Sequence, residues 1–244
     1  MVNLLYTELL KLKRAHMLWV SIIGAAAAPV MIFIGFMNSR SAHPDEPVTF
    51  EVSFYNTNLY VLLLIGTLLY GVITSYLFHR EYAEDTLKNL LIIPVSKLSL
   101  IVSKCLMLFL WIMLLTAVAW GLTFVLGLIG RFDGLTAAVI LVSLKQFFLG
   151  GCLLFLLSTP TIFVTLLFKN YVPTIIFTAV ITMANVALAS HEYRVLFPWS
   201  AVHAIAVQGF IPEYPALYSY IAVSVASLAG FAATVIYFEK SDIH

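Results

Sequence analysis

Few residues in this chain stand at spacings that support catalysis. His191 and Glu192 begin like a zinc-protease motif, but Val195 stands where that motif needs its second histidine. The sequence contains neither the phosphate-binding pattern G-x-x-x-x-G-K-[ST] nor the G-x-S-x-G nucleophile elbow. Cys105 and Cys152 lie in apolar stretches, which favours small buried side chains over a metal pair or a disulfide. We therefore predict no catalytic residue, no metal site, no cofactor bound by this chain and no energy source of its own.

Lys145, beside Gln146, is the clearest charge at the depth of an apolar stretch. A proton relay inside a membrane needs a carboxylate partner, and the apolar stretches contain no Asp or Glu. We therefore expect the Lys145 ammonium either to reach the lipid headgroups on the outer side of a membrane or to make a polar contact within a helix bundle. Gly150, Gly151 and Pro160 follow in the same stretch and predict a bend or a break there.

The elements that must position these residues are uncharged apolar stretches of about 20 residues or more, each long enough to span a hydrocarbon core of roughly 30 Å. They are residues 17–37, 59–78, 105–130, 146–168, 171–190 and 216–238. In the last stretch, Ala222, Ala226 and Gly230 form a ridge of small residues, which permits close helix packing. The pattern predicts an all-α integral membrane protein with six transmembrane helices.

The composition agrees with this prediction. Of 244 residues, 62% are hydrophobic and only 10% are charged, and the mean hydropathy is +1.01. A soluble domain of this length carries about a quarter charged residues. The net charge of +1 gives no electrostatic footprint for nucleic acid.

Lysine and arginine are distributed unevenly between the two sides of the predicted bundle. The segments on the side of the N-terminus contain Lys11, Lys13, Arg14, Arg80, Lys88, Lys97, Lys104, Lys169 and Lys240. The opposite side has only Arg40, Arg131 and Arg194, whereas carboxylates divide evenly. The positive-inside rule therefore predicts that both termini are cytoplasmic.

Residues 1–16 predict an amphipathic helix that lies at the cytoplasmic membrane interface and precedes a transmembrane domain of residues 17–244. Its polar side carries Lys11 and Arg14, and its apolar side includes Leu5 and Leu9. An ordinary positively flanked membrane anchor is the alternative.

The inside segment 79–98 predicts a second amphipathic helix, between spans two and three. Its polar face holds Glu81, Glu84, Asp85 and Lys88, its apolar face holds Ala83, Leu87, Leu90 and Leu91, and Pro94 ends it. A cytosolic helix with an apolar face needs a partner or the membrane to cover that face. A solvated connector is the alternative.

The outside segments differ from one another. Residues 38–58 are polar, and residues 131–135 predict a tight turn. Residues 191–216 combine prolines with the apolar run 201–207, which is too short to span a membrane. This combination predicts short interfacial or re-entrant helices, with a plain amphipathic loop as the alternative.

The inside segment resembles the permease subunits of ABC-2 type transporters. The resemblance rests on Arg80-Glu81, Thr86-Leu87, Leu90-Leu91, Pro94-Val95-Ser96-Lys97 and Lys104, and on Phe197-Pro198-Trp199-Ser200 in the last outer segment. The resemblance extends to the six-span layout. The size of this chain is most similar to that of the permeases of bacitracin-resistance and lantibiotic-immunity exporters. The chain departs from the family pattern at Asp85, where glycine is frequent, and at Lys97, where arginine is frequent.

The resemblance implies an exporter driven by a separate ATP-binding subunit, present in two copies with ATP and Mg bound there, and a second permease chain, the same or related. Segment 79–98 would be the coupling helix, with Arg80, Glu81, Glu84, Asp85, Thr86, Leu87, Leu90, Leu91 and Pro94 at the ATPase. Phe197, Pro198, Trp199 and Ser200 would belong to an outer gate or re-entrant loop. An antimicrobial peptide, an antibiotic or another amphipathic substrate would cross or leave the bacterial plasma membrane.

Two other classes of protein remain possible from the residues alone. One is a stand-alone secondary transporter, although such proteins usually need an intramembrane carboxylate or a pair of broken helices. The other is a membrane protein that gives immunity by binding an antibiotic.

Overall fold

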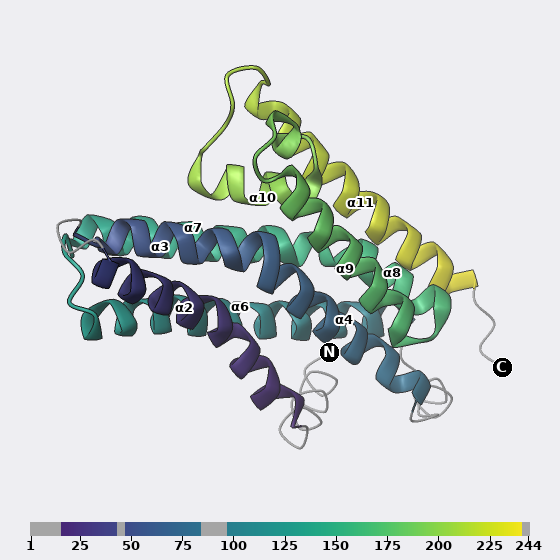
Figure 1. The fold of residues 1–244 in the computed structure, drawn as a ribbon. Helices are drawn as coiled ribbons and strands as arrows, with labels where there is room; N and C mark the ends of the chain where they lie inside the picture. The colour runs from purple at the N-terminus through teal and green to yellow at the C-terminus, as the bar shows by residue number, and fades with distance from the viewer. Residues whose placement is uncertain (1–15, 43–46, 84–96, 241–244) are drawn as a thin grey trace.

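A computed structural model describes residues 16–42, 47–83 and 97–240, and these form an all-helical bundle (Figure 1). The elements are α2 (Met17–Ala42), α3 (Phe50–Tyr60), η1 (Val61–Ile65), α4 (Gly66–Ala83), α6 (Lys97–Ile129), α7 (Ala137–Leu156), α8 (Ser158–Phe168), α9 (Tyr171–Leu188), η2 (Glu192–Val195), α10 (Pro198–Val207) and α11 (Ala216–Lys240). Within the described residues, 6 helical stretches are long and apolar enough to cross a membrane. The predicted six spans are confirmed.

Three spans begin earlier than their uncharged cores indicate. The second begins at Phe50 rather than residue 59, because α3, η1 and α4 follow one another without a break in the helix. The third begins at Lys97 rather than at Cys105, and the fourth at Ala137 rather than at Gln146. The prediction that residues 38–58 form a polar connection is therefore wrong from Phe50 onward. Glu51 consequently lies in the first turn of a span, which corrects the expectation that the spans contain no carboxylate.

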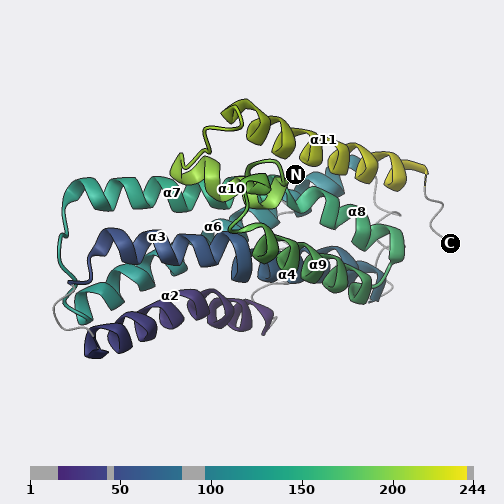
Figure 2. The same ribbon diagram turned by 45° about the horizontal axis from the view of Figure 1, so that its top comes forward.

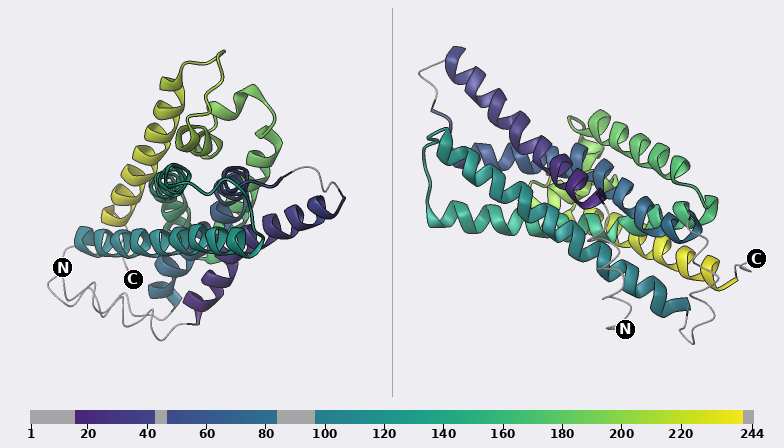
Figure 3. Two further views of the ribbon diagram at one scale, coloured as in Figure 1. Left: turned by 90° about the vertical axis from the view of Figure 1, so that its left-hand side faces the viewer. Right: turned by 90° about the horizontal axis from the view of Figure 1, so that it is seen from below.

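The residues just before α3 and the connection after α6 lie side by side at one end of the bundle (Figure 1 and the right-hand panel of Figure 3). The Phe50 amide donates to the Asp133 carbonyl at 2.9 Å, and the Asp133 amide donates to the Val48 carbonyl at 3.0 Å. Arg131 (φ 51°) and Gly134 (φ 76°) reverse the chain here, as the predicted tight turn requires. At the opposite end, the His79 ring meets the Tyr171 ring at 5.6 Å. The spans therefore alternate in direction.

The bundle has two groups of helices joined by the second span. On one side α2, α3, α6 and α7 run alongside one another, and on the other α8, α9 and α11 pack together (Figures 1 and 2). The core of the first group is aromatic: Phe54 stacks on Trp120 at 6.0 Å, and Phe50 contacts Phe124 and Phe132. Aromatic pairs of this kind add to the energy of burial.

The fourth span is broken, but not at its glycines. The α-helix stops at Leu156 and restarts at Ser158, just before Pro160. Gly150 and Gly151 stay helical and permit close contacts, because a Cβ at Gly150 would lie 2.6 Å from the tip of Leu62. A Cβ at Gly230 of α11 would lie 2.8 Å from the Pro160 Cα. The small residue Gly230 thus lets α11 pack directly on the backbone of α8, as its ridge predicts.

Residues 191–216 contain the short helix η2 and the ten-residue helix α10. Short helices are therefore present there, as predicted, and their interfacial or re-entrant position stays a prediction. Residues 200–206 of α10 are all buried, so this helix packs into the protein between α7, α9 and α11 (Figure 2). Pro198 occupies the first turn of α10, where its missing amide costs no helical hydrogen bond.

Candidate functional site

The centre of the second span is a π-helix, Val61–Ile65, held by a polar residue from another span. A π-helical turn displaces backbone carbonyls from their usual partners, and such turns are frequent at functional sites. Asn185 of α9 donates from Nδ2 to the freed Leu63 carbonyl at 3.0 Å, and the Thr67 hydroxyl donates to the Leu62 carbonyl at 2.8 Å. Asn185 is fully buried. Together these bonds join α9 to the irregular turn of the second span.

The first turn of α10 completes this junction. The Ser200 hydroxyl donates to Asn185 Oδ1 at 3.1 Å, and the Trp199 ring contacts Phe197 and Phe177. Of the sequence-predicted outer residues, Phe197 precedes α10, and Pro198, Trp199 and Ser200 open it. The structure therefore brings this stretch against the second and fifth spans. We name the set Leu63, Thr67, Asn185 and Ser200 the polar junction.

Buried polar atoms without a partner flank the polar junction. Thr57 and Asn58 of α3 are fully buried, and their side-chain polar atoms make no hydrogen bond in the described structure. His203 of α10 is buried with its Nε2 unpaired, and its ring meets Tyr55 edge-on at 5.4 Å. Burial, assisted by the nearby Arg194 charge, lowers the pKa of His203 to about 4. No three His, Cys, Asp or Glu side chains gather into a metal site among the described residues.

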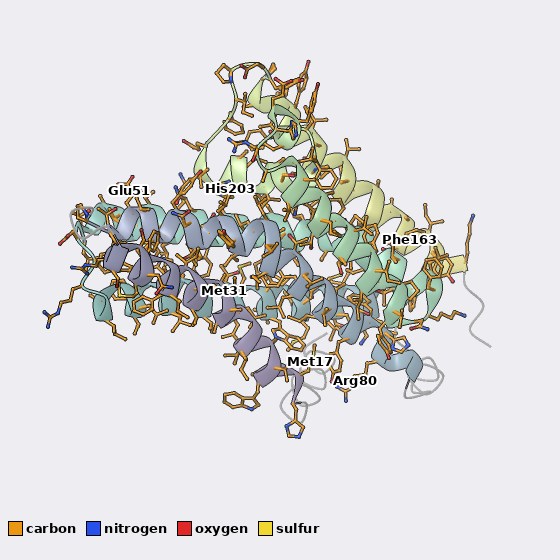
Figure 4. The ribbon with its side chains drawn as sticks, viewed as in Figure 1. Met17, Met31, Glu51, Arg80, Phe163 and His203 are labelled. Carbon is orange, nitrogen blue, oxygen red and sulfur yellow. The ribbon has the colours of Figure 1, made fainter. Side chains whose placement is uncertain are left out.

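A groove of about 320 Å³ lies between α3 and α7, at the end of the bundle where these helices begin. Its lining residues are Glu51, Val52, Phe54, Tyr55, Ala138, Val139, Val142, Ser143 and Gln146. Gln146 therefore faces the groove, whereas its neighbour Lys145 is exposed. Figure 4 shows Glu51 on the same side of the molecule as His203.

The opposite end of the second span leads to the predicted coupling segment. Arg80 is half-buried in the last turn of α4, and Glu81 belongs to the same helix. Lys104 of α6 is buried and donates from Nζ to the Leu77 carbonyl at 3.2 Å, which fixes this end of α4 against α6. Glu84, Asp85, Thr86, Leu87, Leu90, Leu91 and Pro94 lie outside the described residues, as do Leu5, Leu9, Lys11 and Arg14.

Sequence reasoning missed Asn185, the burial of Lys104 and the π-helix. Asn185 is a polar residue inside an apolar span, which is a usable signal because such side chains usually bond between helices. Lys104 precedes the uncharged core and is easily read as a cytoplasmic flanking charge. No residue pattern in Val61–Ile65 distinguishes a π-helix from an α-helix.

Comparison with known proteins identifies the family. Residues 4–185 match the family described as "ABC-2 family transporter protein". The chain is also 59% identical over 208 residues to the bacitracin transport permease protein BCRB of Bacillus licheniformis. That alignment covers 85% of this chain and 100% of the relative.

The chain belongs to the ABC-2 transporter family.

Membership of the ABC-2 family indicates what this chain does and where it lies. The chain is a membrane permease subunit of an ATP-binding cassette exporter, and it lies in the bacterial plasma membrane as a multi-pass protein. A permease of this family works with an ATPase partner and supplies the non-enzymatic membrane component. The α3–α7 groove, the polar junction and the C-terminal end of α4 all belong to its second span or contact it.

Proposed function

We propose that this permease removes a bacitracin-like peptide from the bacterial plasma membrane, with ATP and Mg bound and ATP hydrolysed by a separate subunit. The observation that carries the proposal is the 59% identity to a bacitracin transport permease across that protein's full length. The expected assembly has two ATPase subunits and two permease chains, the second identical or related.

Both termini lie in the cytoplasm in this proposal, as the excess of lysine and arginine on their side supports. Residues 1–16 lie along the inner membrane surface, with Leu5 and Leu9 toward lipid and Lys11 and Arg14 toward anionic headgroups. Residues 17–244 form the transmembrane domain. The α3–α7 groove then opens near the outer leaflet.

Segment 79–98 acts as the coupling helix, with Leu87, Leu90 and Leu91 covered by the ATPase. Two features of the described residues support this role. Helix α4 ends at Ala83 and so includes the first residues of the segment, and the Lys104 bond to the Leu77 carbonyl holds α4 against α6. A displacement of the coupling segment would therefore move α4 and α6 together.

The polar junction links that movement to the outer side. The π-helix is the least regular part of the second span, and Asn185 and Ser200 connect it to α9 and α10. In the proposal, Phe197, Pro198, Trp199 and Ser200 form an outer gate that shifts with the second span. Lys145, exposed on α7, contacts the outer headgroups.

Co-expression with the ATPase tests the proposed function. The pair should protect a sensitive strain against bacitracin, whereas the permease alone, or the pair with a hydrolysis-deficient ATPase, should not. The double variant Leu87→Ala with Leu90→Ala should reduce recovery of the ATPase with the permease, since each packed leucine contributes about 2–5 kcal/mol.

The control is Asn89→Ala, in the same segment but on neither predicted face. It should leave both recovery of the ATPase and resistance unchanged after normalisation to membrane expression. Full resistance from the permease without any ATPase would exclude the proposed function. Wild-type recovery with the leucine double variant would exclude the coupling role of segment 79–98 alone.

A further inference from the structure

The groove between α3 and α7 has the dimensions and the lining of a small-ligand site. Its volume of about 320 Å³ is at the lower end of such sites, which are mostly apolar with a few well-placed polar groups. Phe54 and Ser143 are buried in its floor, whereas Val52, Tyr55 and Val142 are exposed at its rim. The exposed rim leaves the groove open at the surface of the described bundle.

The polar groups of the groove are few and differ in kind. Glu51 is the charged member of the lining, and it is exposed in the first turn of α3. Gln146 offers an amide from the α7 side, and the Tyr55 ring lies on the α3 side. A carboxylate beside aromatic and aliphatic side chains is complementary to an amine carried on an apolar body.

The floor of the groove is held in place from beneath. Trp120 of α6 donates from Nε1 to the Ser143 hydroxyl at 3.0 Å, and its ring stacks on Phe54 with an interplanar angle of 14°. Ser143 also donates to the Ile140 carbonyl at 2.9 Å. One indole thus positions a floor residue from each of the two helices. Preorganisation of this kind lowers the cost of binding.

We propose that the α3–α7 groove is a binding site for an amphipathic peptide cation, with an amino group of the peptide paired to Glu51 and apolar side chains along Phe54, Val139 and Val142. The inference rests on the proposed function for the identity of the peptide, but its geometry is independent of the coupling segment. A lipid acyl chain would fill the apolar surface but would leave Glu51 and Gln146 without a complementary group.

Binding of bacitracin to the purified permease–ATPase complex in nanodiscs of zwitterionic lipid tests this site. Glu51→Gln keeps the shape of the side chain and removes its charge, and should raise the Kd roughly threefold to tenfold. The same peptide with acetylated amino groups should bind the wild type and Glu51→Gln with equal Kd. Ala138→Trp, which fills the groove from an exposed position, should raise the Kd of both peptides.

Two matched controls separate the site from general damage. Glu192→Gln removes an exposed carboxylate from η2, outside the groove, and Ala137→Trp places the same ring on the exposed neighbour that does not line it. Both should bind bacitracin like the wild type, and complex yield verifies that all four variants fold.

Unchanged bacitracin binding by Glu51→Gln would overturn the proposal. Displacement of co-purified lipid by Ala138→Trp, with peptide binding intact, would assign the groove to lipid and overturn it also. In either case, the proposed function would still hold if the wild-type permease protected cells against bacitracin only together with the ATPase. If the wild-type pair gave no protection, the proposed function itself would be excluded.

Discussion

The first and second spans have similar hydropathy but different surroundings. In the apolar window of α2, 22% of residues are buried inside the protein, whereas in the second span the share is 67%. Helix α2 presents Trp19, Ile23, Met31 and Ile34 on its exposed side. The second span instead contains the π-helix, the unpartnered Thr57 and Asn58, and the contact with Asn185. Irregular backbone and buried polar groups thus occur where other helices, rather than lipid, surround the chain.

The largest expected effect comes from adding a side chain to a glycine of the second span. A Cβ at Gly71 would lie 2.8 Å from the Cβ of Thr178, whose hydroxyl is bonded to the Thr174 carbonyl, so this neighbour cannot turn aside freely. We expect Gly71→Val to destabilise the protein by about 3 kcal/mol, as overpacking does. Thermal unfolding in detergent measures the change.

Gly35 of α2 is the matched control, because a Cβ there would have no neighbour within 4 Å. Gly35→Val should unfold at the wild-type temperature. Equal losses of stability in the two variants would mean that burial does not decide how well each span tolerates a larger side chain.

The next prediction concerns α10, which covers the second span and lies outside the six spans. With the pKa of His203 at about 4 in the folded state against an ordinary 6.5, the unfolded state takes up the proton first as pH falls. The contribution of neutral His203 to stability is therefore complete above about pH 6.5 and is lost progressively toward pH 4. At pH 5 the loss should be on the order of 2 kcal/mol.

Unfolding of wild type and His203→Gln at pH 7 and pH 5 measures this loss. The variant should lose less stability than the wild type between these two values. His16→Gln, at an exposed histidine before α2, should keep the wild-type dependence. If His203→Gln and the wild type lost the same stability between pH 7 and pH 5, His203 would take up its proton as easily in the folded state as in the unfolded state.

A smaller effect is expected at the polar junction. Asn185→Leu retains the volume but leaves the Leu63 carbonyl and the Ser200 hydroxyl without their partner. A buried group left unpaired costs about 1–2 kcal/mol, and we expect transport to fall more than stability does. Asn38→Leu, on an exposed position of α2, should change neither property. Resistance assays at matched expression distinguish the two variants, and normal transport by Asn185→Leu would remove the junction from the mechanism.

The same difference between spans explains which features the sequence predicts. Most of helix α2 is at least partly exposed on the surface of the bundle, so its residues are mostly apolar. Its uncharged apolar stretch therefore predicts its position well. Glu51, Ser53, Thr57 and Asn58 reduce the hydropathy at the start of the second span, so composition places that span too late. Ser53, Thr57 and Asn58 are in fact buried by neighbouring helices, which only a three-dimensional structure reveals.

The candidate site is predictable to different degrees. The Phe197–Ser200 stretch is recognisable from its resemblance to the family, and its place at the start of α10 agrees with the predicted short helix. The groove depends on α3, which composition assigns to a loop, so its combination of Glu51 with Gln146 could not be foreseen. The predictions for segment 79–98 fall mostly outside the described residues and remain to be tested.

The smallest expected effect lies at the attachment of α2 to the rest of the bundle. Trp111 of α6 is buried and donates from Nε1 to the Ser21 hydroxyl at 3.0 Å, while Ser21 donates to the Leu18 carbonyl. Trp111→Phe, Ser21→Ala and the double variant form a cycle that isolates this interhelical bond from the loss of packing. Bonds between membrane helices contribute about 0.6 kcal/mol on average, and we expect a coupling energy of this size. A coupling energy near zero would mean that packing alone holds α2 to α6. A coupling energy as large as the effect of Asn185→Leu would mean that a polar bond holds α2 in the bundle as strongly as one holds the second span.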